Sequence, residues 1–141
     1  MRHRSHGTGE FRLEDFARIG ADCVLEPHVL VFHPENIVLG DNVYVGHQTI
    51  LKGYYKDRMV IGDHTFIGQQ CFLHSAGGIE IGARVGIGPG VRILTSVHRE
   101  AGRDTPILES PITFGRVVIE DDADIGVSAV ILPGVRVGRG A

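Results

Sequence analysis

The chain has 141 residues, enough for one domain with its own core but not for two. Its 20 glycines and lack of Trp disfavour a wide core packed with aromatic rings. A formal charge of -3 gives no general attraction to nucleic acid or anionic membranes, and no apolar run approaches the ~18 residues of a spanning helix. We therefore expect a protein that binds no nucleic acid and inserts into no membrane. Because Met1 to Glu10 is polar and has no signal-peptide core, we also expect it to be cytoplasmic.

We expect residues 1–12 to be a polar tail and residues 13–141 to be a single repeat domain. In this domain aliphatic side chains return every six residues, apart from interruptions by loops. They are Leu13, Ile19, Leu25, Val31, Leu39, Val45, Leu51, Ile61, Ile67, Leu73, Ile81, Ile87, Ile93, Ile119, Ile125, Ile131 and Val137. A period of six is neither that of a strand nor that of an α-helix, and it is typical of a parallel β-helix.

Two further positions of each hexad support this interpretation. Gly follows the aliphatic residue in nine hexads, which favours corners where a side chain would crowd the backbone. Nine glycines inside helices would cost about 1 kcal/mol each, which argues against a helical fold. The fourth residue after the aliphatic one is small or β-branched, and we expect it to face inward. This inward position includes Cys23, Thr49, Thr65, Cys71 and Val97, so both cysteines are expected to be core thiols.

Three hexads make one coil of 18 residues, and residues beyond that number are expected to form loops. The predicted coil starts are Ile19, Leu39, Ile61, Ile81 and Ile119. The longest loop is predicted at residues 99–118, directly after His98. Coils stacked about 4.8 Å apart would bury one another's inner faces and pair their backbones. The sequence therefore predicts an all-β fold, a triangular parallel β-helix with one long loop insertion, whose hand the pattern leaves open.

The stretch from Ile81-Gly82 to Val97-His98 resembles the segment of hexapeptide-repeat acetyltransferases, especially sugar and xenobiotic O-acetyltransferases, that ends in their catalytic His. Residues 111–126 are similar to the same enzymes after that His, and Ile131-Leu132-Pro133-Gly134-Val135 completes the match. The resemblance implies a left-handed β-helix and acetyl-CoA as the acetyl donor. It also implies a homotrimer whose active sites lie in the grooves between neighbouring prisms.

The resemblance assigns the catalytic role of general base to His98, whose imidazole would take a proton from the attacking hydroxyl or amine. It assigns to the backbone N–H of Val127 the role of donating a hydrogen bond to the thioester oxygen. The acceptor is expected to be a sugar or a similar small molecule, with O- and N-acetylation both open.

The same carry-over predicts further binding residues. The groove for the coenzyme would be lined by Gly126, Val127, Ser128 and Ala129, with Arg116 and Arg136 as candidates for its phosphates. His74 is expected to face the acceptor, because it lies one coil below the His98 region. Thr113 stands where several relatives have a Glu that orients the catalytic imidazole, and Glu109 is the candidate to replace that Glu on the acceptor side.

Two other classes of protein remain as alternatives. A γ-type carbonic anhydrase shares the prism and holds zinc with three histidines, two of them five residues apart. Here that spacing joins Gln69 to His74, and because Gln is a poor zinc ligand we expect no metal. A non-enzymatic β-helix scaffold is the other alternative, but such a scaffold needs no long loop that begins at a histidine.

Overall fold

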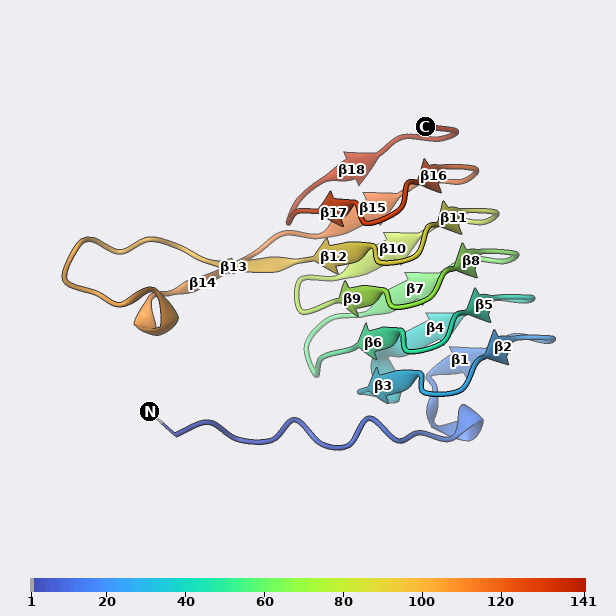
Figure 1. Ribbon diagram of the computed structural model, residues 1–141, viewed down its shortest axis with the longest axis horizontal. Coiled ribbons are helices and arrows are strands. Elements are labelled where there is room, and N and C mark those ends of the chain that lie inside the picture. Colours follow the sequence, from blue (N-terminus) through green and yellow to red (C-terminus); the bar gives the residue numbers. More distant parts are fainter. Residues whose placement is uncertain (1) are drawn as a thin grey trace.

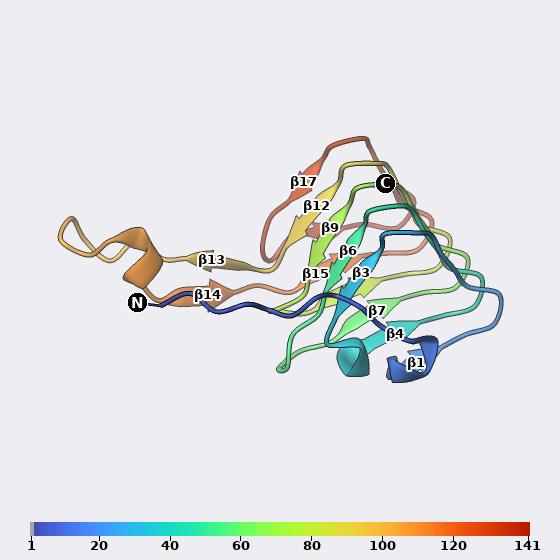
Figure 2. The same cartoon turned by 60° about the horizontal axis from the view of Figure 1, so that its bottom comes forward.

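The computed structural model describes residues 2–141, and its strands form the three sides of a left-handed triangular prism (Figures 1 and 2). The first sheet contains β1 (Arg18–Ile19), β4 (Ile37–Leu39), β7 (Met59–Ile61), β10 (Ile79–Ile81), β15 (Val117–Ile119) and β18 (Arg136–Val137). The second contains β2 (Val24–Leu25), β5 (Tyr44–Val45), β8 (Phe66–Ile67), β11 (Gly86–Ile87) and β16 (Asp124–Ile125). The third contains β3 (Leu30–Phe32), β6 (Ile50–Lys52), β9 (Phe72–His74), β12 (Arg92–Leu94) and β17 (Val130–Ile131).

Two more strands, β13 (Ser96–His98) and β14 (Ile112–Phe114), form an antiparallel hairpin that projects from the prism (Figure 1). The short 3-10 turns are η1 (Leu13–Asp15), η2 (Pro34–Asn36) and η3 (Ile107–Glu109). Within residues 2–141 no helix has the length and apolar character needed to cross a membrane.

The register of the sheets confirms the predicted repeat. In the first sheet the pairing runs through the predicted coil starts, from Ile19 and Leu39 up to Ile119, and ends at Val137. Every strand of the three sheets is parallel to its neighbours, so each coil lies directly on the one below. The all-β, left-handed β-helix expected from the sequence is therefore confirmed.

The interior of the prism contains the aliphatic and small positions of the hexads. Leu39, Ile61 and Ile93 are fully buried, and together with their equivalents in other coils they form one continuous core. Thr49 is buried as well, and its hydroxyl donates to the carbonyl of Gly68 at 2.9 Å. Cys71 is a buried free thiol, as predicted. Buried hydroxyls and thiols are tolerated here because they find backbone acceptors in a neighbouring coil, as Thr49 and Cys71 do in the coil above and Thr95 does in the coil below.

The corners of the prism depend on two different positions of the hexad. The left-handed backbone conformation occurs three residues after the aliphatic position, at Asp22, His28, Asn42, Gln48, His64, Gln70, Arg84, Asp122 and Ser128. The glycines directly after the aliphatic residues serve the close approach of coils instead. A Cβ on Gly46 would lie 2.6 Å from the backbone carbon of Gly68 in the coil above. The crowding expected at the glycines is thus present. The left-handed backbone conformation, however, falls three residues after the aliphatic position, where the sequence carries no signal for it.

The first coil begins later than the period of six predicts. Leu13 and Ala17 are exposed rather than inward, because the chain forms the turn η1 there. Phe16 enters the core in their place and is 7% exposed. Phe11 packs against the Phe16 ring edge to face, with centroids 5.9 Å apart, so two aromatic rings close the lower end of the prism.

The long excursion also differs from the predicted loop 99–118. The chain leaves the prism at Ser96, and Val97 is 54% exposed instead of inward, because Thr95 takes the buried position. The chain has returned by Val117, which is fully buried in β15. His98 is therefore part of the projecting hairpin rather than the last residue of the prism.

The crowded glycines provide a test of the stacking. Gly46→Ala is expected to lower the free energy of unfolding by about 1–3 kcal/mol, because the added methyl group would force two coils apart. Gly126→Ala is the matched control at the same hexad position, where a Cβ would meet no atom within 4 Å, and should change it by less than about 0.5 kcal/mol. Chemical denaturation measures both, and equal losses would contradict this account of the repeat.

Candidate active site

The hairpin and the segments that follow β6 and end β9 in the third sheet enclose a pocket around His98. The pocket has a volume of about 330 Å³ and is lined by Tyr54, Tyr55, Lys56, His74, Ala76, Ser96, His98, Ile112 and Phe114. Three separate parts of the chain supply these residues: the segment after β6, the end of β9, and the hairpin. The structure thus brings His98 and His74 into one pocket, and the expectation that His74 faces the acceptor stays a prediction.

His98 is held in one orientation by the backbone of the hairpin. Its Nδ1 lies 3.0 Å from the carbonyl oxygen of Ser110, which can only accept a hydrogen bond. Nδ1 therefore carries the proton, and Nε2 of a neutral imidazole has its lone pair free to accept one. The acceptor is a carbonyl of a buried residue, whose own hydroxyl donates to Ile107 at 2.6 Å and fixes the turn η3.

His74 forms a hydrogen bond with Tyr54 across the floor of the same pocket. The Tyr54 hydroxyl and the His74 Nε2 lie 2.9 Å apart, and the two rings are in contact. Burial lowers the pKa of His74, and the charge of Lys52 lowers it as well. Burial raises the pKa of Tyr54, so both groups stay neutral near pH 7. His74 Nδ1 is buried and has no hydrogen-bond partner within residues 2–141.

The walls of the pocket are aromatic and aliphatic, and its one charged rim group is cationic. The Lys56 ammonium lies 5.2 Å from the centroid of the Phe114 ring, and Phe114 and Ile112 are each about half exposed. In the described part of the chain, residues 2–141, no carboxylate lines the pocket. The pocket therefore offers ring stacking, several polar side chains and one positive charge, together with an imidazole able to accept a proton.

The residues predicted to hold the donor lie elsewhere in the chain. Val127 is at the corner between β16 and β17 and is 70% exposed. The hydrogen bonds within residues 2–141 include none from its N–H. Because a Cβ on the adjacent Gly126 would meet no atom within 4 Å, the space beside this N–H is open. Ser128 and Ala129 complete the same corner, which lines no pocket in common with His98.

The other predicted site residues are placed as follows. Arg116 forms ion pairs with Asp57 at 3.0 Å and with Glu80 at 3.4 Å. Arg136 pairs with Glu120, which keeps the pKa of that carboxyl low. Within one chain both guanidinium groups thus already have carboxylate partners, and their binding to coenzyme phosphates stays a prediction. Glu109 is exposed on η3 and does not line the pocket, so its role also stays a prediction.

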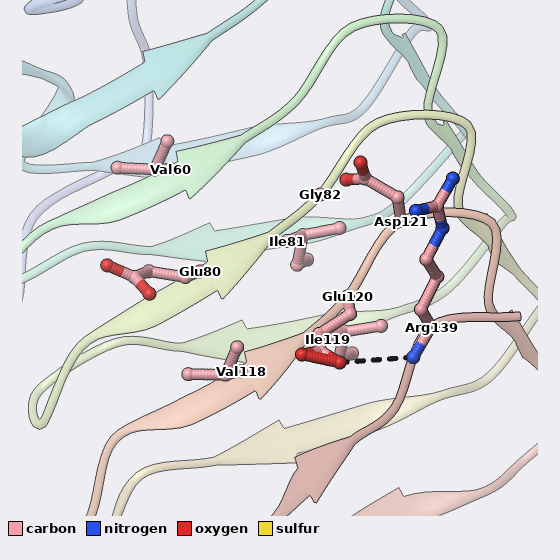
Figure 3. A pocket seen from close by; sticks show the side chains of 9 residues that line it. All are labelled: Val60, Glu80, Ile81, Gly82, Val118, Ile119, Glu120, Asp121 and Arg139. Atoms are coloured by element: carbon pink, nitrogen blue, oxygen red, sulfur yellow. Dashed lines mark hydrogen bonds between the residues drawn. The ribbon is translucent and has the colours of Figure 1, made fainter. Parts of the chain in front are cut away.

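Another hollow, of about 380 Å³, lies on the outer face of the first sheet (Figure 3). Its charged lining consists of Glu80, Glu120, Asp121 and Arg139, and the Glu120 carboxylate already accepts hydrogen bonds from the Arg139 backbone and the Arg136 side chain. In the part of the chain that the structure describes, no three His, Cys, Asp or Glu side chains are grouped so that they could hold a metal ion. The pocket of His98 therefore has the better chemistry for catalysis.

Two segments, residues 58–94 and 116–141, match the family described as the hexapeptide repeat of succinyl-transferase. They span the third to sixth coils on either side of the hairpin. The hexapeptide repeat inferred from the sequence is thereby confirmed, and the fold is that of a left-handed β-helix built from such repeats. No curated protein matches the sequence.

Solved structures share this fold. The structure of AntD, an N-acyltransferase from Bacillus cereus in complex with dTDP and 3-hydroxybutyryl-CoA, has a TM-score of 0.78 and 22% identity. The alignment covers 90% of this chain and 69% of AntD. An AntD variant in complex with dTDP-4-amino-4,6-dideoxyglucose and coenzyme A has a TM-score of 0.67 and 21% identity over 89% and 68% of the two chains. At this identity the likeness shows the fold alone.

Sequence reasoning missed several residues of the pocket. The carbonyl of Ser110 leaves no mark in the sequence, because every residue has one. Tyr54 and Lys56 lie in a short insertion after Leu51, where the period of six is interrupted and assigns no position. The register offered a signal, since β6 ends on Lys52 directly below His74. The insertion that follows Lys52 must therefore lie beneath the hairpin.

The lowered pKa of His74 predicts how stability depends on pH. The unfolded chain takes up a proton at His74 near pH 6.5 more readily than the folded one, so the free energy of unfolding should decrease as pH falls below about 6.5. Denaturation at about pH 7.5 and about pH 5.5 should show a smaller decrease for His74→Gln than for the wild type. If the two proteins lose equal stability, His74 is not the group responsible.

Proposed function

We propose that the chain is an acyl-CoA-dependent acyltransferase that moves an acetyl group to a hydroxyl or amine of a sugar or similar small acceptor. The observation that carries this proposal is the hydrogen bond from His98 Nδ1 to the Ser110 carbonyl, which leaves Nε2 free inside a pocket large enough for a small acceptor. AntD supports the wider class, because its complexes contain an acyl-CoA or coenzyme A together with a dTDP nucleotide or amino sugar.

In this mechanism His98 acts as the general base. Its Nε2 accepts the proton that the acceptor loses as its oxygen or nitrogen attacks the thioester carbon. The N–H of Val127 donates to the oxygen that becomes negatively charged. When the carbon–sulfur bond breaks, His98 returns its proton to the departing thiolate. The acyl group and one proton have then exchanged places between donor and acceptor.

A single chain does not place these two groups in one site, and this supports a trimer with shared sites. His98 projects on the hairpin, whereas Val127 lies on the later coils and lines no pocket with it. Val127 at that corner, Val130 in β17 and Leu132 directly after β17 expose apolar side chains, so the surface beside the free N–H suits either a pantetheine chain or a neighbouring subunit. In the proposed trimer the hairpin of one prism meets the Val127 corner of the next.

His98→Ala should lower turnover by about 10²- to 10⁴-fold, the usual value of a general base, while coenzyme A affinity stays nearly unchanged. Steady-state kinetics with thiol release from acetyl-CoA measures the first effect, and calorimetry with coenzyme A measures the second. His74→Ala is the matched control from the same pocket and should raise the acceptor KM more than it lowers kcat. Wild-type kcat in His98→Ala at saturating acceptor would rule out this role of His98.

The proposed assembly is tested separately. Analytical ultracentrifugation should give a mass of three chains, or about 46 kDa from the 15.3 kDa of one chain. We expect the exposed apolar surface around Val127 to form the contact between subunits. Val127→Asp should therefore weaken the trimer without unfolding the prism. A protein that remains monomeric at micromolar concentration would contradict both the trimer and an active site shared between subunits.

A further inference from the structure

A second hollow lies beside the pocket of His98, on the other side of two tyrosines. Its volume is about 330 Å³, and it shares Tyr54 and Tyr55 with the His98 pocket. The remaining lining comes from the ends of β3 and β6 and from the N-terminal tail. In both views of the molecule the tail and the hairpin extend from the same side of the prism (Figures 1 and 2). The two hollows therefore adjoin, with only a pair of aromatic side chains between them.

Hydrogen-bond donors dominate the polar lining of this second hollow. Lys52 Nζ lies 2.8 Å from His6 Nδ1, and because an ammonium group can only donate, His6 Nδ1 accepts. His6 Nε2 must then carry the proton, so it is a donor. His33 Nδ1 donates to the Glu35 carboxylate at 2.8 Å, and its Nε2 takes no part in this bond. The Ser5 hydroxyl accepts from the Gly7 backbone and still has its own proton to donate.

Lys52 is partly buried and lies against two aromatic rings. Its Nζ is 3.9 Å from the centroid of the Phe32 ring and 5.7 Å from that of Tyr54. Partial burial lowers its pKa. Among residues 2–141 no carboxylate lines the hollow, and the nearby Glu35 is paired with His33. The ammonium thus lacks a negative partner there, and an anion held between Lys52 and His6 would supply one.

We propose that this hollow, built by Lys52, His6 and Ser5, binds a phosphate group of the acceptor whose hydroxyl or amine faces His98. The inference rests on the proposed function, and it narrows the acceptor to a phosphorylated molecule. Lys52 pairs in register with His74, so the phosphate site lies one strand spacing, about 5 Å, below the floor of the His98 pocket. One sugar ring stacked over Tyr54 and Tyr55 would join the two sites.

Coenzyme A also carries phosphates, but the proposed mechanism places its thioester at the Val127 corner and not at Lys52. The third sheet separates β6, which carries Lys52, from β17, which follows Val127, by three strand spacings, or about 14 Å. Neighbouring prisms of a parallel trimer keep that difference in height. We assign the hollow to the acceptor because it adjoins the pocket of His98, where the proposed mechanism places the acceptor.

The test uses inorganic phosphate as the probe and the full-length protein. Phosphate titrated at low ionic strength should shift the backbone amide NMR signals of Lys52, Gly53 and Tyr54. Lys52→Met keeps the aliphatic stem on Phe32 and removes the charge, and it should weaken binding by about tenfold or more. Lys56→Met, which changes the other lysine of the chain, is the matched control and should bind phosphate as the wild type does. Absence of shifts, or equal binding by Lys52→Met, would overturn the proposal.

Two further measurements separate the source of the phosphate from the proposed chemistry. Glucose 1-phosphate should compete with inorganic phosphate where glucose does not, and Lys52→Met should leave coenzyme A affinity unchanged. Loss of coenzyme A affinity in Lys52→Met would assign the hollow to the donor and overturn the acceptor assignment. His98→Ala should retain phosphate binding. The phosphate site and the catalytic role of His98 are therefore tested independently, and either proposal can fail while the other stands.

Discussion

Each coil of the prism buries its apolar side chains only against the coils directly above and below it. An isolated coil has no core, so the free energy of the fold comes from contacts between equivalent residues of successive coils. This dependence demands a close and constant spacing. The spacing in turn requires Gly where a Cβ would meet the next coil, as at Gly46, and it places buried hydroxyls such as that of Thr49 within reach of a carbonyl one coil away.

The candidate site exists because the repeat is interrupted twice on one edge. The insertion after β6 places Tyr54 beneath His74, and the hairpin β13–β14 places His98 beside them. Neither interruption disturbs the stacking, since Val117 returns to full burial in register with Ile79. The prism therefore supplies a rigid frame, and the chemistry is carried by segments that do not belong to it.

Much of the fold could be predicted because a period of six reports the inward positions directly, and the pairing of Ile19, Leu39 and Ile61 follows from counting. The prediction was wrong where tertiary packing replaces the period. Phe16 is buried although Leu13 occupies the periodic position, and Thr95 is buried although Val97 does. For the candidate site, the sequence singled out His98 and His74, which line one pocket in the structure, and their roles stay a prediction. The Ser110 carbonyl that orients His98 could not be predicted, since backbone groups are chemically alike in every sequence.

The tail beneath the first coil has a consequence for how copies of the chain meet. The lowest strands of a parallel prism present unpaired backbone groups, which form a ready template for another chain. Here the carbonyl of Gly9 accepts the N–H of Val31 at 2.9 Å, and Phe11 closes the apolar interior from below. A chain without this tail would expose unpaired backbone amides and the apolar lower end of the core. The tail therefore covers the end at which the edge of one prism could pair with the edge of another.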